Sequence, residues 1–184
     1  MKATVTKFIE SKLKLKVNQA KSAIDRPWKR KFLGFSFSVN EQPKVRIAKQ
    51  SLQKAKAKIR EITSRKKPMK MEERIKELNQ YLIGWCGYFS LADTPSIFMD
   101  MDKWIRRRLR MCLWKQWKLP KTKVKRLVSL GIPKDKAFEW GNTRKGYWRV
   151  AGSPILSRAL DNYYWKSNGL KSLTDRYNYL RNIS

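Results

Sequence analysis

The sequence predicts a mainly α-helical protein, in which a helical bundle follows a short β-hairpin. Three observations lead to this prediction. Apolar residues recur at helical spacing over most of the chain after residue 48, whereas strict apolar–polar alternation is confined to the residues before it. The 184 residues are 41% hydrophobic and include eight Trp, seven Tyr and seven Phe. This composition can build a core and argues against disorder, although the net charge is +30.

The first part of the chain combines one helix signal with two strand signals. Residues 2–10 predict a short helix, and residues 13–17 alternate Leu or Val with Lys, as a strand does. Residues 33–39 alternate again, and the sequence Asn-Glu-Gln-Pro at 40–43 is a turn signal. Because residues 45–47 continue the alternation, these segments predict a β-hairpin.

Three longer helices are expected next. An apolar stripe over residues 52–62 predicts a helix that ends before Pro68. Residues 71–89 carry an apolar stripe of about five turns. Thr94-Pro95 is typical of a helix start, and that helix is expected to run to about Lys118.

Shorter elements fill the rest of the chain. Helices are expected over residues 121–130, 135–140, 153–166 and 170–181, with a loop from 141 to 152. Gly84 and Gly87 lie opposite the apolar stripe of their helix. They predict either close packing of another helix or the approach of an RNA backbone.

The segment from Lys103 to Arg126 holds eleven Lys or Arg residues, no acid, and three tryptophans. A cationic surface set with aromatic rings suits a polyanion with flat bases, which is nucleic acid. Trp114 is interpreted in two ways, as a ring that stacks on bases or as part of a second core layer. On the wheel of this helix, Arg107 falls on the polar face and Trp104 in the apolar stripe. Arg108 falls on the apolar side and is expected to need an acidic partner or a bend.

Several classes of function are excluded by composition. There is no histidine, and the two cysteines, Cys86 and Cys112, lack the spacing of a zinc site or a disulfide framework. Asp100 and Asp102 are two residues apart on a helix, so their carboxylates are expected to diverge and to favour the positive start of that helix. No signal peptide and no membrane span is predicted, and an intracellular, cytoplasmic protein is expected.

Several motifs carry a resemblance to a known family. Residues 13–22 (Leu-Lys-Leu-Lys-Val-Asn-Gln-Ala-Lys-Ser) and 31–37 (Lys-Phe-Leu-Gly-Phe-Ser-Phe) resemble the last two conserved blocks of a reverse transcriptase palm. Residues 59–66 (Ile-Arg-Glu-Ile-Thr-Ser-Arg-Lys) and 78–89 (Leu-Asn-Gln-Tyr-Leu-Ile-Gly-Trp-Cys-Gly-Tyr-Phe) resemble the maturase-specific thumb region of group II intron proteins. Segments similar to the end of that domain are Leu130-Gly-Ile132, Arg144-Lys-Gly-Tyr-Trp148, Gly169-Leu170 and Asp175-Arg-Tyr177.

The resemblance implies a division of the chain and a function. Residues 1–48 would be the remnant of a reverse transcriptase palm, and residues 49–184 the helical thumb and maturase-specific domain. The implied function is to bind group II intron RNA and to assist its folding and splicing, as part of an intron-encoded RNA-directed DNA polymerase active in intron mobility. The alternative from another class is a structural basic nucleic-acid-binding protein without a maturase role.

The chain departs from this family in its catalytic residues. No two aspartates are adjacent, so the Tyr-x-Asp-Asp block that holds the metal pair is missing and the chain alone is not expected to polymerise. No cofactor is expected in this chain, and Mg²⁺ is expected only with the missing palm or with the intron RNA. The implied partners are intron RNA, a DNA target or primer–template, and a chain that supplies the palm, with no membrane.

The candidate RNA-binding residues are Trp114 and cations drawn from the basic stretches. The resemblance also places Lys21 near the nucleotide and primer strand, and the hairpin at 32–37 near the primer end. The full set is Lys21, Lys54, Lys58, Arg65, Lys66, Lys67, Lys103, Arg106, Arg107, Arg110, Trp114, Lys115, Lys118, Lys121, Lys123, Lys125, Arg126, Arg144, Lys145 and Arg149. No catalytic and no metal-binding residue is predicted.

Overall fold

Helices dominate the structure. The computed structural model describes residues 2–18, 22 and 25–183. Within these residues the elements in chain order are α1 (Lys2–Ser11), the 3-10 helix η1 (Pro27–Lys29), β1 (Phe35–Phe37), β2 (Val45–Ile47), α2 (Lys49–Ile62), α3 (Met71–Phe89), α4 (Pro95–Gln116), α5 (Pro120–Ser129), α6 (Lys134–Gly141), α7 (Tyr147–Ala151), α8 (Pro154–Ala159), α9 (Asn162–Ser167) and α10 (Leu173–Ile183). The predicted mainly α-helical fold with a short β-hairpin is confirmed.

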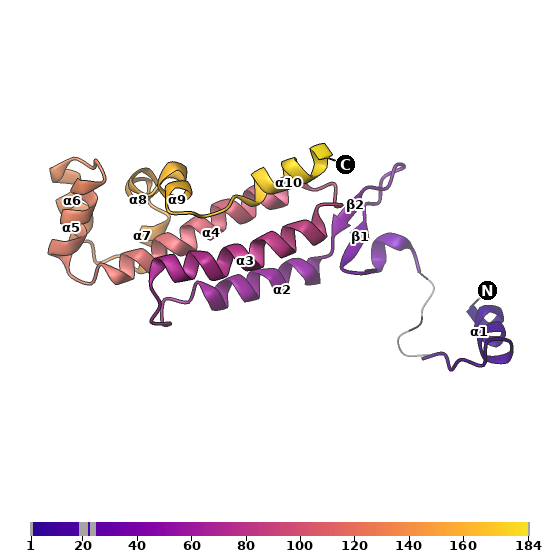
Figure 1. Cartoon of the computed structure of the whole chain (residues 1–184). Helices are drawn as coiled ribbons and strands as arrows, with labels where there is room; N and C mark the ends of the chain where they lie inside the picture. The colour runs from indigo at the N-terminus through magenta and orange to yellow at the C-terminus, as the bar shows by residue number, and fades with distance from the viewer. Residues whose placement is uncertain (1, 19–21, 23–24, 184) are drawn as a thin grey trace.

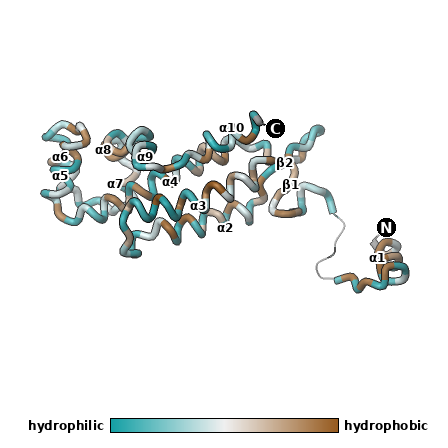
Figure 2. The backbone as a smooth tube through the Cα atoms, viewed as in Figure 1, coloured by the Kyte–Doolittle hydropathy of each residue, from teal (hydrophilic) through white to brown (hydrophobic). Residues whose placement is uncertain are grey.

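Three long helices, α2, α3 and α4, form the body of the molecule (Figure 1). Their apolar stripes meet in one core, in which Ile59, Leu78 and Ile105 are each at most 1% exposed. Because burying such a side chain contributes ~1.5–3 kcal/mol, this shared core stabilises the helices more than their intrinsic propensity does. Figure 2 shows hydrophobic and hydrophilic residues alternating along these helices, as amphipathic helices require.

The β-hairpin packs against the C-terminal end of α3. Phe35 pairs with Ile47 across the antiparallel sheet, and its ring centroid lies 5.6 Å from that of Tyr88 and 5.1 Å from that of Phe89. Gly34 adopts a φ of +84°, and a Cβ atom there would lie 3.2 Å from the Phe89 ring. A glycine is therefore needed where the hairpin backbone meets α3.

The later helices cover α4 and return the chain to the body. The short helix α7 packs on α4 through Val150 and Ala151, both fully buried, and α10 packs on both α3 and α4. Helices α5 and α6 pack on each other at the end of the molecule opposite the hairpin, whereas α1 stands apart from the bundle (Figure 1). Within the described residues, no helix is both long enough and apolar enough to cross a bilayer.

The carboxylate of Asp102 holds the start of α10. It accepts hydrogen bonds from Ser172 Oγ (3.1 Å), the Leu173 amide (2.9 Å), and the amide and hydroxyl of Thr174 (3.0 and 2.7 Å). Asp102 is buried, while the Asp100 side chain is 77% exposed. The sequence analysis assigned both acids to the start of their own helix, and for Asp102 this was wrong, because it supplies the N-terminal cap of a helix seventy residues later.

Three predicted elements differ from the structure. Residues 13–17 form no strand, and the predicted loop at 141–152 contains α7. The single helix predicted over residues 153–166 is two helices, α8 and α9. The break occurs because Asp161 caps a new helix by accepting a hydrogen bond from the Tyr164 amide at 2.8 Å.

The glycines that permit close packing are not the predicted ones. A Cβ atom at Gly84 or Gly87 would meet nothing within 4 Å, so the expected helix contact there is wrong, and the approach of an RNA backbone stays a prediction. At Gly141 a Cβ atom would lie 2.5 Å from the Val124 side chain. This glycine therefore allows α6 to pack closely on α5.

Two arginines near the C-terminal end of α2, Arg108 of α4 and Arg74 of α3, are held by oxygen atoms of the chain instead of acids. Arg108 donates to the Thr63 hydroxyl (2.5 Å) and to the carbonyls of Thr63 and Arg60 (3.2 and 3.3 Å). Arg74, which is 1% exposed, donates to three backbone carbonyls of the α2–α3 connection. The expectation of an acidic partner for Arg108 was wrong, because carbonyl and hydroxyl oxygens satisfy its guanidinium.

Candidate RNA-binding surface

Positive charge is in large excess and is poorly neutralised within the chain. The sequence has 44 Lys and Arg residues against 14 acids, so thirty cations would remain even if every acid were paired. Within the described residues, six ion pairs form, and all involve at least partly exposed side chains. Exposed ion pairs contribute ~0–1 kcal/mol each to stability. The remaining cations repel one another, and this repulsion favours the binding of a polyanion.

Helix α7 brings arginines and exposed aromatic rings together on one surface. The Arg65 guanidinium lies 4.9 Å from the ring centroid of Tyr147, and that of Arg107 lies 4.2 Å from the ring centroid of Trp148. Arg107 Nη2 also donates to the Trp148 carbonyl at 3.1 Å. Tyr147 and Trp148 stay 37% and 38% exposed, so they have free surface on which a base or ribose can pack.

We call this set the Arg–aromatic surface. It consists of Arg65, Arg107, Arg144, Tyr147, Trp148 and Arg149. Arg65, Arg144 and Arg149 are exposed, and Arg107 is half-buried. The structure therefore brings Arg65 of the α2–α3 connection and Arg107 of α4 onto the rings of α7, and Arg144 and Arg149 are the exposed cations next to these rings along the chain. Among these residues only the two aromatic ones were absent from the predicted set.

The same surface depends on a close approach at the end of α7. A Cβ atom at Gly152 would lie 2.7 Å from the Arg107 guanidinium, so the arginine passes directly over the glycine. Arg107 thus positions α7 on α4 in addition to carrying charge. The sequence analysis placed Arg107 on a purely polar face, and this was incomplete because a predicted loop supplies the helix that covers it.

A second group of cations surrounds Trp104. Lys56 Nζ and the guanidinium carbons of Arg60 and Arg108 lie 5.9, 5.5 and 5.4 Å from its ring centroid. Burial, and to a lesser extent the charges of Arg60 and Arg74, lower the pKa of Arg108. The sequence analysis missed this group because it assigned Trp104 to the apolar stripe. The i, i+4 spacing of Lys56 and Arg60 was the available signal.

Two predicted RNA contacts have structural roles. Trp114 is 2% exposed and packs 5.8 Å from Trp117 between ring centroids, so it belongs to the core and offers no free ring face. Arg110 donates to the Leu160 carbonyl at 3.4 Å. Burial, together with the charges of Arg106 and Arg107, lowers the pKa of Arg110 to about 10, which leaves it charged at neutral pH.

The remaining predicted cations are spread over several elements. Lys58, Lys67 and Lys103 are exposed and form ion pairs with acids of the same chain. Lys123 lies over the Trp114 ring and Lys145 over the Trp140 ring, both at 4.9 Å. Arg106 is half-buried, and Lys21 lies outside the described residues. The other members are exposed: Lys54, Lys66, Lys115, Lys118, Lys121, Lys125 and Arg126. The structure thus does not gather the predicted set on one face.

The described residues contain no group of three or more His, Cys, Asp or Glu side chains placed to hold a metal ion. Cys86 and Cys112 are both buried, and burial raises the pKa of Cys86 to about 11. A thiol of that kind is a poor nucleophile at neutral pH. The groups that the Arg–aromatic surface does offer are guanidinium cations and partly exposed aromatic rings.

Comparison with known protein families gives a match over the central part of the chain. Residues 52–130 match the family model described as the group II intron, maturase-specific domain. The match begins in α2 and ends just after α5, so it covers most of α2 and all of α3 and α4. No curated protein matches the chain. The match supports the interpretation that the chain is a C-terminal part of a group II intron maturase and has a role related to splicing.

Proposed function

We propose that this chain is an RNA-binding maturase domain that binds group II intron RNA and assists its folding and splicing. The observation that carries the proposal is the maturase-specific match over residues 52–130, which includes both Arg65 and Arg107. These two arginines contact the exposed rings of α7. In this proposal the intron RNA supplies the splicing chemistry, and the protein stabilises the folded RNA.

The physical properties of the surface support RNA as the partner. Phosphates would be neutralised by the unpaired cations, which would release counterions and make the affinity dependent on salt. Exposed Tyr147 and Trp148 would pack on unpaired bases, where the strong contacts of RNA-binding proteins are made. Trp104, with three cations within 6 Å of its ring, would provide a second point of attachment.

We also propose that residues 1–48 belong to a reverse transcriptase palm and residues 49–184 to the thumb and maturase domain. The hairpin region exposes large apolar side chains, with Phe32 at 73%, Leu33 at 66% and Val39 at 69%. Surface of this kind is typical of a protein contact. In this proposal the hairpin packs on the rest of the polymerase palm, and an intron-encoded reverse transcriptase supplies polymerase activity and contacts with DNA.

The proposal is tested by competition binding. The protein is bound to a labelled group II intron RNA at about 150 mM salt, and unlabelled RNAs are added. A maturase domain is expected to need roughly 100-fold more of a structured, non-intron RNA of equal length than of unlabelled intron RNA, because specific contacts add to the phosphate contacts. Equal competition by both RNAs across several group II introns would instead favour the alternative, a structural basic nucleic-acid-binding protein.

A further inference from the structure

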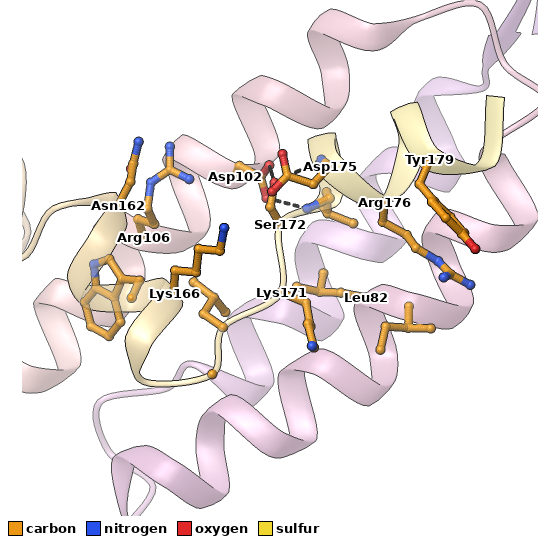
Figure 3. Close-up of a pocket in the computed structure, with 15 residues that line it drawn as sticks. Leu82, Asp102, Arg106, Asn162, Lys166, Lys171, Ser172, Asp175, Arg176 and Tyr179 are labelled. Atoms are coloured by element: carbon orange, nitrogen blue, oxygen red, sulfur yellow. Dashed lines mark hydrogen bonds between the residues drawn. The ribbon is translucent and has the colours of Figure 1, made fainter. Parts of the chain in front are cut away.

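A groove outside the Arg–aromatic surface is lined by residues of α3, α4, α9 and α10 (Figure 3). Its volume is about 900 Å³, at the upper end of the range for ligand sites. Ile83, which is 40% exposed, and the half-buried Leu170 contribute apolar surface to it, whereas Leu82 and Trp165 in its lining are buried. A groove of this size fits a short single strand better than a duplex.

Four cations line this groove: Arg106, Lys166, Lys171 and Arg176. Among the ion pairs of the described residues, none includes any of them. Asp102 and Asp175 are the carboxylates in the lining, so the net charge is +2. The oxygens of Asp102 are already engaged by the four donors at the start of α10, which leaves the cations available for an external anion.

The cationic side chains are spread along the groove. Figure 3 shows Arg106 and Lys166 near Asn162 at one end, Arg176 beside Tyr179 at the other, and Lys171 between them. Tyr179 is 58% exposed, and the Arg176 guanidinium lies 5.8 Å from its ring centroid. Cations near an exposed ring, beside apolar surface, provide contacts for both phosphates and bases.

The loop that carries Lys171 is fixed before any ligand binds. Asn79 Nδ2 donates to the Gly169 carbonyl at 2.7 Å, and the Lys171 amide donates to Asn79 Oδ1 at 2.9 Å. Gly169 has a φ of +84°, which a residue with a side chain rarely adopts. With Asp102 holding the next residues, the loop is preorganised, and preorganisation lowers the entropic cost of binding.

We propose that this groove holds a short single-stranded segment of RNA, with Lys166 and Lys171 on phosphates and Tyr179 on a base. The inference deepens the proposed function, on which it rests, by assigning a further RNA contact separate from the Arg–aromatic surface and from Trp104. Lys166, Lys171 and Arg176 were absent from the sequence-predicted set. Their role emerges only when α9 and α10 are placed beside α4.

The test measures fluorescence anisotropy of an unstructured RNA of about eight nucleotides with the full chain. The double variant Lys166→Gln/Lys171→Gln is expected to bind roughly tenfold more weakly, and the slope of log affinity against log salt is expected to fall in magnitude by about 1.4. Tyr179→Ala is expected to weaken binding by about fivefold or more with an unchanged slope. The control Lys7→Gln/Lys12→Gln, the α1 control, removes the same charge from exposed positions in α1 and directly after it, and is expected to bind within about twofold of wild type.

Each outcome decides one of the two proposals. Unchanged binding by the groove variant, or equal loss in the α1 control, overturns the groove assignment. So does an octaglutamate peptide that competes as well as RNA for the wild-type protein, because the groove would then be a site for acidic peptides. The intron competition assay is run on the same variant: retained intron preference leaves the proposed function standing, and absence of preference in the wild-type protein removes it.

Discussion

Trp114→Ala is expected to lower the free energy of unfolding by about 3–5 kcal/mol, because it empties a buried tryptophan site. The Trp114 side chain is 2% exposed and shares the core with Trp117. For a chain of this length, that loss corresponds to a fall of roughly 6–20 °C in melting temperature. The measurement is thermal unfolding followed by circular dichroism.

Trp148→Ala is the matched control, since Trp148 is 38% exposed. Its loss of stability is expected to be near 1 kcal/mol, the size of one cation–π contact. If the Trp114→Ala protein had the melting temperature of the wild type and bound RNA less tightly, the core assignment would be contradicted. It would restore base stacking as the role of this ring.

The triple variant Arg65→Gln/Arg144→Gln/Arg149→Gln is expected to lose on the order of 100-fold in affinity for intron RNA at about 150 mM salt. If each arginine meets a phosphate, the slope of log affinity against log salt falls in magnitude by about 2–3. All three side chains are exposed, so the cost to stability is expected to be within ~0.5 kcal/mol each. Filter binding over a range of salt concentrations, with melting curves on the same samples, measures both quantities.

The contrasting variant is Arg107→Gln/Arg110→Gln on α4. These residues donate to the carbonyls of Trp148 and Leu160, so their replacement is expected to lower the melting temperature. An unchanged salt slope in the triple variant would show that the exposed arginines meet no phosphates. A triple variant that unfolds at lower temperature than the α4 variant would show that structural and binding roles were assigned the wrong way round.

The helices of the body could be predicted from the sequence because each carries a long apolar stripe and a clear stop signal. Helix α2 ends at Ile62, before Pro68, and α4 begins at Pro95 after Thr94, as expected. The predicted hairpin also formed, because alternation and a proline-containing turn agree there. Local sequence patterns of this kind therefore predict helices and strands reliably.

The errors arose where distant segments decide the structure. Trp114 lies off the apolar stripe of α4, but a second layer of helices covers it. Asp102 carries no local sign that it caps α10, because its hydrogen-bond partners lie about seventy residues away. The 13–17 segment alternates as a strand does, but no neighbouring strand pairs with it within the described residues.

The candidate surface was predicted in part for the same reason. Arg65, Arg144 and Arg149 could be predicted as candidates because they lie in basic stretches, which can be read directly from the sequence. Which cations lie together depends on the docking of α7 and α10 onto α4. The groove beside α9 therefore had no signal that a single sequence could provide, and the cluster around Trp104 had only the i, i+4 spacing of Lys56 and Arg60.

The most direct test of the proposed maturase function is the splicing of a group II intron RNA at a Mg²⁺ concentration too low for unaided splicing. Wild-type protein is expected to raise the splicing rate, and the triple variant Arg65→Gln/Arg144→Gln/Arg149→Gln is expected to raise it at least tenfold less at equal concentration. A polylysine peptide of matched positive charge serves as the control and is expected to give no comparable increase. Equal stimulation by polylysine, or by the triple variant, would contradict the claim that this surface makes the chain a maturase domain.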